Sequence, residues 1–324
     1  MILGIESTAH TFGIGIVNNG KILANVTDIY TTEEGGIVPN EAAKHHEEKA
    51  EEVYQKAIEE AGIDEEDIDA IAFSQSPGLA PCLIKGLKFT KKKAKEINKP
   101  VVPVNHCIAH LEIGGLTGAT NPVLLYVSGA NTQIISYASG KYRIFGETLD
   151  QGAGNFIDKF AREAGLGFPG GPEVEKWAKK GKYVELPYTI KGMDVSFSGL
   201  LTNLKQKLNS GDYKLEDLSY SLQETAFAML IEAAERAMAH LKKDELLLGG
   251  GVACNQRLQK MAKIMCNERD AELYVPNNPL LRDNGAMIAY LGEKIFNSGI
   301  KTKDIENLDI NPRLRTDEIE VNWK

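Results

Sequence analysis

Two histidines four residues apart, His106 and His110 in the segment HCIAH, carry the clearest chemistry in the chain. On a helix, residues at this spacing lie one turn apart on the same face, so both imidazoles can bind one metal ion. Such a pair also arises by chance among satisfied core residues, so further ligands are needed to decide. Two candidates are present: Tyr126, at the end of an apolar strand, and Asp283, just before the last helix.

The donor types indicate which metal and which reaction such a site would suit. Two imidazoles, a carboxylate and a phenolate form a mixed nitrogen and oxygen site, which suits iron or zinc better than magnesium. In metalloproteases of the H-E-x-x-H type, a glutamate beside the first histidine activates the metal-bound water. Here the uncharged Cys107 follows His106. A metal-dependent peptidase or other hydrolase stays an alternative, but it would need a base from elsewhere.

The elements that must position these residues contain a repeat. An apolar hairpin occurs at 2–26 and again at 123–146, each time with a turn rich in Ser, Thr, Gly or Asn after its first strand. Such turns expose backbone N–H groups and hydroxyls, which suit phosphate oxygens. The alternative is a pair of ordinary hairpins whose turn residues serve only backbone conformation. Because a duplicated half-fold usually has its site between the halves, we expect a central cleft.

Each hairpin is followed by alternating helices and strands. After the first we expect elements at 40–61, 70–78, 82–97 and 101–105, and a short helix from His106. After the second we expect a Gly-rich connection at 150–171 and elements at 215–241, 245–253, 255–265 and 284–296. This order predicts an α/β fold with two lobes, 1–119 plus 300–324 and 120–299. It is similar to the actin, heat-shock ATPase and hexokinase superfamily, which is an analogy about fold alone.

Composition narrows the class of protein. With 324 residues, 43% of them hydrophobic, the chain can bury cores for two lobes. It has no apolar run long enough to span a membrane and no secretory signal, so we expect a cytoplasmic protein without a membrane partner. Its four cysteines form no C-x-x-C pair, which is typical of reduced thiols.

The charge distribution bears on nucleic-acid binding. A net charge of -8 argues against holding a nucleic acid by bulk electrostatics. One segment of the chain is nevertheless lysine-rich, with Lys85, Lys88, Lys91, Lys92, Lys93, Lys95 and Lys99. A solvated helix face is the simpler interpretation, and phosphate contacts are the alternative. If the protein acts on RNA, we expect partner proteins to help bind it.

Six motifs occur in order along the chain: HCIAH, YVSGANTQ, FGETLDQGAGNFIDKFAREAGLGFPGGP, DVSFSGLLT, GGGVACNQRL and RDNGAMIAY. Together they resemble one family, the universal tRNA threonylcarbamoyl transferases, called TsaD in bacteria. The segment AHT after Glu6-Ser7-Thr8, together with Tyr126, is similar to the archaeal and eukaryotic branch, the catalytic subunit of the KEOPS complex. Ser76, Ala80, Ala130 and Cys254 depart from the family pattern but remove no charged or metal-binding group.

The resemblance implies an acyl transfer to tRNA. The threonylcarbamoyl group would pass from threonylcarbamoyl-adenylate to N6 of the adenosine just 3′ of the anticodon, with release of AMP. The metal, one divalent or trivalent ion with iron favoured over zinc, would be held by His106, His110, Tyr126 and Asp283. It would polarise the carbonyl as a Lewis acid and anchor the threonyl part.

The resemblance also assigns residues to the adenylate or to an ATP- or AMP-type nucleotide. The turn Tyr126, Val127, Ser128, Gly129 and Ala130 would take the phosphate and acyl portion. Asp158, Gly171, Glu175 and Asn255 would contact the nucleotide, where both carboxylates can accept from ribose hydroxyls. For Asp158 and Asn255 the alternative is a helix cap.

The sequence identifies the catalytic groups less clearly than the metal and nucleotide residues. Glu6 stands where the superfamily usually has Asp, and His10 fills the same turn, so both are candidate catalytic residues. His10 or the leaving phosphate would take the amine proton. Besides tRNA, the family implies three partners: a small atypical protein kinase, sometimes fused at the C-terminus, a dimerising KEOPS subunit and a kinase-binding KEOPS subunit. A non-catalytic nucleotide-binding scaffold stays a further alternative.

Overall fold

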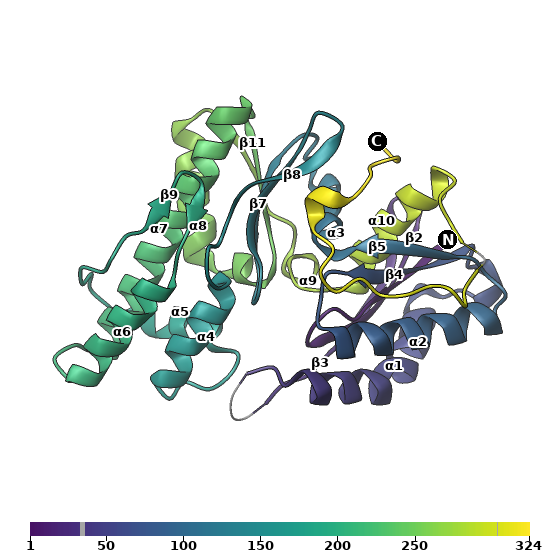
Figure 1. Ribbon diagram of the computed structural model, residues 1–324, viewed down its shortest axis with the longest axis horizontal. Helices are drawn as coiled ribbons and strands as arrows, with labels where there is room; N and C mark the ends of the chain where they lie inside the picture. The colour runs from purple at the N-terminus through teal and green to yellow at the C-terminus, as the bar shows by residue number, and fades with distance from the viewer. Residues whose placement is uncertain (33–35, 303) are drawn as a thin grey trace.

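Two five-stranded sheets form the framework of the molecule, one in each lobe (Figure 1). The first contains β1 (Ile2–Glu6), β2 (Thr11–Asn18), β3 (Lys21–Ile29), β4 (Ala70–Ser76) and β5 (Val101–Asn105). The second contains β6 (Val123–Val127), β7 (Thr132–Ala138), β8 (Lys141–Glu147), β11 (Glu245–Gly249) and β12 (Glu272–Tyr274). A separate pair is formed by β9 (Ile190–Lys191) and β10 (Asp194–Val195). The computed structural model describes residues 1–32, 36–302 and 304–324.

The two sheets repeat one topology. The strand order is β3-β2-β1-β4-β5 in the first and β8-β7-β6-β11-β12 in the second. In each sheet the first strand of the hairpin pairs antiparallel with the second strand and parallel with a later one. All residues of β1 and β6 are buried, as expected for strands covered on both faces. The predicted two-lobed duplicated α/β fold is confirmed.

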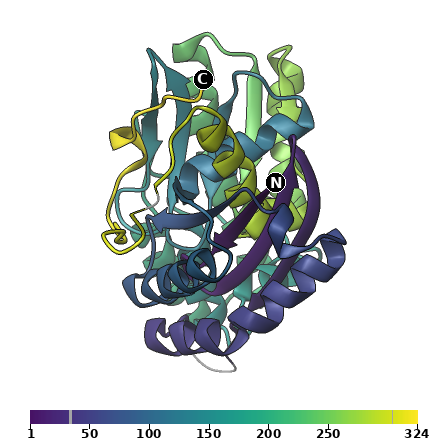
Figure 2. The same cartoon turned by 90° about the vertical axis from the view of Figure 1, so that its right-hand side faces the viewer.

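Helices cover the sheets in both lobes (Figures 1 and 2). Those between β3 and β6 are α1 (Pro39–Ala61), η1 (Glu65–Asp67), α2 (Ala80–Glu96), α3 (His106–Glu112) and η2 (Ile113–Thr117). The later ones are α4 (Ala153–Glu163), α5 (Gly170–Ala178), α6 (Ser198–Ser210), α7 (Leu215–Leu241), η3 (Gly251–Cys254), α8 (Gln256–Glu268), α9 (Asn278–Leu281), α10 (Gly285–Asn297) and η4 (Thr316–Glu318).

Most expected elements are present, and two differences have clear causes. The expected strand 245–253 ends at Gly249, because Gly250 has a φ of +89° and lies against the end of β6. A Cβ on Gly250 would come within 2.3 Å of the carbonyl oxygen of Val127. The sequence does not predict helix α6, because its apolar pattern is weak. In the structure only three of its thirteen residues, Leu200, Leu201 and Leu204, are buried.

Helix α10 packs across the first sheet, although it lies in the range 120–299 expected for the second lobe. Glycines in β1 and β2 allow this close approach. A Cβ on Gly4 would lie 2.2 Å from the backbone nitrogen of Ala289, and one on Gly15 would lie 2.2 Å from that of Ala286. Helices α3 and α10 share one hydrophobic cluster with residues of both sheets. This cluster forms a core between the lobes.

The lysine-rich segment forms α2, and carboxylates neutralise much of its charge. Lys85 pairs with Glu47, while Lys92 and the buried Lys93 both pair with Glu51. These contacts join α2 to α1 and favour the interpretation as a structural helix face over phosphate contacts. Among the residues that the structure describes, no helix is both long enough and apolar enough to cross a membrane.

His46 on α1 should make the fold sensitive to acid. It is fully buried and packs against Phe12, and burial together with His45 lowers its pKa from 6.5 to about 4. The unfolded chain takes up this proton first, so stability is complete above pH 6.5 and falls as the pH drops to about 4, by up to about 3 kcal/mol. We expect His46→Leu to remove this part of the loss, measured by urea unfolding from pH 7 to pH 4. Equal pH slopes for wild type and variant would contradict it, with His240→Leu as the exposed control.

Candidate metal and nucleotide site

Helix α3 begins directly after β5 and brings both histidines into the core between the lobes. The Asn105 side chain caps the helix by accepting from the backbone N–H of Ile108 at 3.1 Å. All seven residues of α3 are buried. The rings of His106 and His110 lie side by side, with centroids 4.8 Å apart and an interplanar angle of 83°. The spacing read from the sequence therefore places two imidazoles on one buried face.

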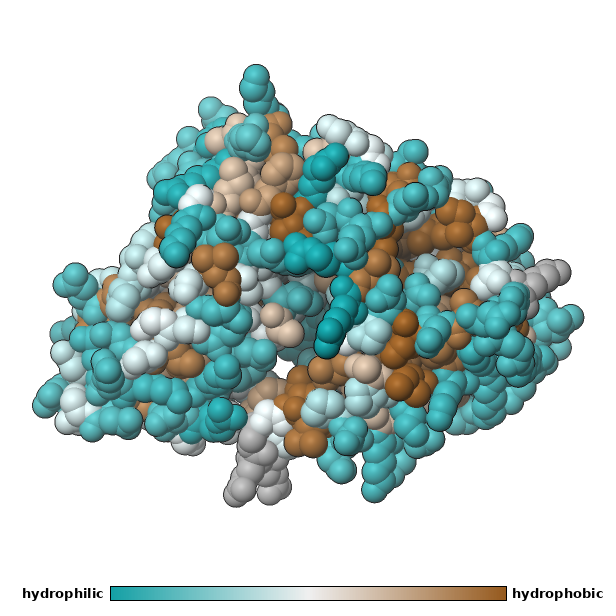
Figure 3. Space-filling view, viewed as in Figure 1, coloured by the Kyte–Doolittle hydropathy of each residue, from teal (hydrophilic) through white to brown (hydrophobic). Residues whose placement is uncertain are grey.

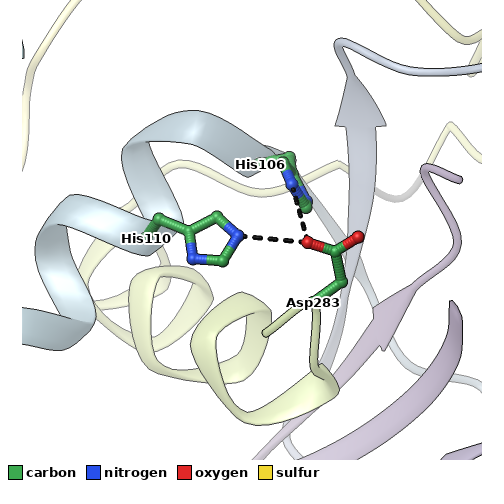
Figure 4. Close-up of side chains that lie close together, drawn as sticks. All are labelled: His106, His110 and Asp283. Carbon is green, nitrogen blue, oxygen red and sulfur yellow. Dashed lines mark hydrogen bonds and ion pairs between the residues drawn. The ribbon is translucent and has the colours of Figure 1, made fainter. Parts of the chain in front are cut away.

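Asp283 reaches the same point from the loop between α9 and α10 (Figure 4). Its Oδ1 lies 3.4 Å from Nε2 of His106 and 3.3 Å from Nε2 of His110. The next residue, Asn284, caps α10 by accepting from Met287 N at 2.9 Å, which places Asp283 just ahead of the helix. The ligand atoms of the three residues lie within 4.8 Å of one another. They are contributed by segments that are far apart in the sequence.

Tyr126 completes the group from the end of β6. Its hydroxyl lies 3.1 Å from Nε2 of His106, and its ring centroid is 4.9 Å from that of His110. The side chain is only 1% exposed, and burial raises the pKa of the phenol. The structure thus brings together all four residues that the sequence proposed as metal ligands.

The donor set and its electrostatics fit a metal ion. Neighbouring ligands around an ion with bonds of about 2.1 Å lie roughly 3.0 to 3.4 Å apart. Nε2 of His106 keeps such distances to Oδ1 of Asp283 and to the hydroxyl of Tyr126, at 3.4 and 3.1 Å. Burial opposes the charge of Asp283, but His106 and His110 outweigh it and hold the carboxyl pKa well below its usual range. Burial also disfavours charged His106, but Glu6 leads the groups that raise its pKa well above 6.5. The buried carboxylate of Asp283 therefore keeps a negative charge, which a bound cation at this point would compensate.

Glu6 lies on the Nδ1 side of the His106 ring, opposite the Nε2 atom that faces Asp283. It is fully buried, and its Oε2 is 2.9 Å from Nδ1 of His106. Its Oε1 accepts from the backbone N–H and the hydroxyl of Thr8, at 2.7 and 2.5 Å. With both oxygens engaged, Glu6 is placed to orient an imidazole so that Nε2 faces Asp283 and Tyr126. This geometry favours a positioning role over the direct catalytic role expected from the sequence.

His10 lies in the turn of the first hairpin and is half-buried. Its carbonyl accepts from the backbone N–H of Tyr30 at 2.8 Å, while its Nδ1 is buried without a partner among the described residues. Burial raises the pKa of Asp158 in the second lobe, and the charge of His10 partly opposes this shift. Figure 3 shows the surface hollowed between the two lobes.

The turn of the second hairpin is backed by helix α4. The backbone N–H groups of Gly154 and Asn155 donate to the carbonyls of Ser128 and Gly129 at 3.0 and 2.9 Å. A Cβ on Gly154 would lie 2.7 Å from the Cα of Gly129, so only glycine allows this contact. The first N–H groups of α4 are thus used within the protein and do not form an anion site. Val127 is buried, while Gly129 and Ala130 are exposed at the end of β6.

Three of the expected nucleotide residues gather around α5. Asp158 on α4 accepts from the backbone N–H of Gly170 at 2.8 Å, and burial raises its pKa. Gly171 faces open space, since a Cβ there would meet no atom within 4 Å. Glu175 accepts from the backbone N–H of Gln256 at 3.0 Å and so connects α5 to the start of α8.

Asn255 is the cap of α8, which is the alternative left open by the sequence. Its Oδ1 accepts from the N–H groups of Arg257 and Leu258 at 2.9 and 3.2 Å, and its Nδ2 donates to Gln223 at 2.6 Å. We expect Asn255→Ala to lower the free energy of unfolding by about 1 kcal/mol, since a cap residue is lost. Asn255→Asp keeps the acceptor and should retain most of it. Urea unfolding compares the two, and equal losses would contradict the cap.

Two residues that hold parts of the cleft in place, Asp150 and Thr8, are not identified by the sequence. Asp150 accepts from Phe197 N, Ser198 N and the Ser196 hydroxyl, so it holds the start of α6. An aspartate in a Gly-rich connection gives no signal of this contact. Thr8, which binds Glu6, was signalled only as one of several hydroxyls in the turn.

Cys107 tests the hydrolase alternative. It is 1% exposed, and burial raises the pKa of its thiol. A protonated, buried thiol cannot serve as the base that activates a metal-bound water beside His106. The structure thus offers no support for peptidase chemistry at the position where zinc peptidases carry their glutamate.

Comparison with known structures shows the fold. The HypF of T. kodakarensis matches with a TM-score of 0.61 and 14% identity over 95% of this chain and 49% of that chain. Component A of the (R)-2-hydroxyglutaryl-CoA dehydratase of Acidaminococcus fermentans matches with a TM-score of 0.55 and 13% identity, covering 90% of this chain and 97% of that one. At these identities, the likeness concerns the two-lobed architecture alone.

Sequence comparison shows the family. The TsaD family model, described as tRNA N6-adenosine threonylcarbamoyltransferase, matches residues 21–290. An enzyme of that name from Thermococcus sibiricus is 56% identical over 99% of both chains. A protein of Methanosarcina mazei, named a probable bifunctional tRNA threonylcarbamoyladenosine biosynthesis protein, is 52% identical over 99% of this chain but only 59% of its own length. The chain belongs to the tRNA N6-adenosine threonylcarbamoyltransferase family, acyltransferases that act in tRNA processing.

Proposed function

We propose that the cleft transfers the threonylcarbamoyl group from threonylcarbamoyl-adenylate to N6 of the tRNA adenosine 3′ of the anticodon. The amine nitrogen forms a bond to the carbamoyl carbon, the bond from that carbon to the phosphate oxygen breaks, and AMP leaves. One observation carries the proposal: His106, His110, Tyr126 and Asp283 converge between the lobes of a chain that belongs to this family.

The four converging residues would hold one divalent or trivalent metal ion, with iron favoured over zinc. A phenolate and a carboxylate beside two imidazoles suit iron. Once bound, the ion would supply Lewis-acid polarisation of the carbonyl and an anchor for the threonyl part. Among the protein groups, Glu6 orients His106 through Nδ1.

The remaining cleft residues would bind the adenylate and move the proton. Turn residues 126–130 would face the phosphate and acyl portion, while Asp158, Gly171, Glu175 and Asn255 would face the nucleoside. Glu175 and Asn255 meet at the start of α8, so they would act there as one polar edge. His10, with its unpartnered Nδ1 in the described structure, would take the amine proton unless the leaving phosphate does.

We also propose how the lobes and partners are arranged. The lobes would comprise 1–119 plus 300–324 and 120–299, with α10 as the helix of the second range that packs on the first sheet. The longer bifunctional relatives support a kinase partner that is fused in some proteins. The dimerising and kinase-binding KEOPS subunits would complete the complex. A tRNA substrate implies a cytoplasmic reaction.

Reconstitution tests this function. The purified chain is mixed with the other complex members, unmodified tRNA and threonylcarbamoyl-adenylate labelled in the threonyl group. We expect label in tRNA and one AMP released per label, and no label in a tRNA with guanosine at the target position. AMP release without label in tRNA would indicate a hydrolase. Full transfer after loss of His106 and His110 would indicate a nucleotide-binding scaffold.

A further inference from the structure

The C-terminal segment 304–324, here called the strap, crosses from the first lobe to the second (Figures 1 and 2). Its first part is hydrogen-bonded to the end of β4. The side chain of Gln75 donates to the carbonyl of Asp309 at 2.8 Å, and the backbone N–H of Asn311 donates to the carbonyl of Gln75 at 3.0 Å. This end of the strap is thus fixed to the first lobe.

The second part of the strap is attached to β8, the edge strand of the second sheet. Nη2 of Arg315 lies 3.1 Å from Oε1 of Glu147. The ring of Trp323 stacks on that of Tyr142, with centroids 6.4 Å apart and an interplanar angle of 27°. The strap therefore connects the two lobes by contacts that are separate from those in the cleft.

The strap also contacts α3, the helix that carries His106 and His110. The hydroxyl of Thr316, which is buried, contacts the thiol of Cys107. At the other end of α3, the buried carboxylate of Glu112 lies 3.1 Å from Nζ of Lys324 in the strap and 2.6 Å from Nζ of Lys294 on α10. Glu112 also accepts from the hydroxyl of Tyr142. One carboxylate thus joins α3 to both lobes and to the strap.

Ionic contacts hold this junction together with apolar packing, since Ile319, Val321 and Trp323 of the strap pack against the cluster between the lobes. A cavity of about 740 Å³ lies beside it, lined in part by Glu112, Lys294, Trp323 and Lys324. A buried carboxylate is costly unless it is paired, so removal of Lys324 leaves Glu112 less compensated. The less compensated charge would lie in the last turn of α3, two residues after His110.

We propose that the strap is a coupling element that fixes the separation of the two lobes, and that Glu112 is a positioning residue that holds His110 through α3. The first half of this proposal is independent of the reaction, and the second half rests on the proposed metal site. A displacement of the strap would then change the position of His110 in the cleft.

Amide hydrogen exchange of the metal-free protein tests the coupling. The variants are Lys324→Met and Arg315→Gln, whose side chains lie near the surface, so folding should be retained. We expect exchange in 106–112 and 141–147 to accelerate at least tenfold, with no change in α7. Lys205→Met is the matched control, because the Lys205–Glu163 pair lies within the second lobe. Unchanged exchange in both segments would overturn the coupling.

Zinc affinity, measured by titration, tests the positioning role. We expect Glu112→Gln to weaken zinc binding about tenfold and Glu112→Asp to restore part of it, since the aspartate keeps the charge. Equal affinity for wild type and Glu112→Gln would overturn the role of Glu112. A wild-type chain that binds no metal would instead overturn the proposed metal site and the positioning role with it, while the exchange experiment would still decide the coupling.

Discussion

Replacing Asp283 by alanine is expected to remove metal from the purified protein and to lower tRNA acylation at least about a hundredfold. The reason is geometric, because Oδ1 of Asp283 faces Nε2 of both His106 and His110. Without it, the two buried imidazoles and Tyr126 remain, with no carboxylate between the imidazoles to favour a cation. Metal content by mass spectrometry and the rate of acylation with saturating adenylate measure the two effects.

The controls separate metal binding from folding. Asp283→Asn keeps the size of the side chain but not its charge, so metal loss in a variant that unfolds like wild type isolates the charge. His110→Ala should behave like Asp283→Ala, whereas His240→Ala, at an exposed position on α7, should behave like wild type. Full metal occupancy in both Asp283 variants would contradict the proposed ligand set.

Replacing Glu6 by glutamine is expected to weaken metal binding about 10- to 100-fold without removing any group that contacts the metal. Glu6 accepts from Nδ1 of His106 at 2.9 Å and so holds the ring with Nε2 toward Asp283. A glutamine in the same place is neutral and can present its NH₂ group to Nδ1, which would favour the other tautomer. Metal titration of the two proteins measures the effect.

A second variant tests whether the carboxylate itself matters. Glu6→Asp keeps the charge but shortens the side chain, so we expect an affinity between those of wild type and Glu6→Gln. Glu65→Gln is the matched control, since Glu65 binds the hydroxyl of Tyr54 at 2.8 Å elsewhere in the first lobe. If Glu6→Gln bound metal as wild type does but still lost acylation, Glu6 would have a direct catalytic role instead.

The repeated hairpins made the fold predictable. Each is a local pattern of apolar residues and turn residues, and local patterns are what a sequence displays directly. The order of helices and strands after each hairpin then indicated two α/β lobes. The sequence does not predict the packing of α10 on the first sheet. This packing depends on Gly4 and Gly15, which carry no side chain to signal a contact.

The proposed site was predictable only in part. His106 and His110 are four residues apart, so helix geometry alone places them together. Asp283 and Tyr126 could be named as ligands from their residue types and the family motifs. For Asn255, the same residue type fits a ligand and a helix cap, and the structure shows the cap through the N–H groups of Arg257 and Leu258.

By itself, the sequence determined the fold class, the family and the histidine pair, because these depend on local patterns and on motifs in a fixed order. Tertiary structure decided which other residues contact the histidine pair. Glu6 meets His106 across 100 residues, and Asp283 meets His110 across 173. Such contacts depend on how two lobes and α10 pack around α3. The charge that Asp283 retains in the buried interior follows from that packing.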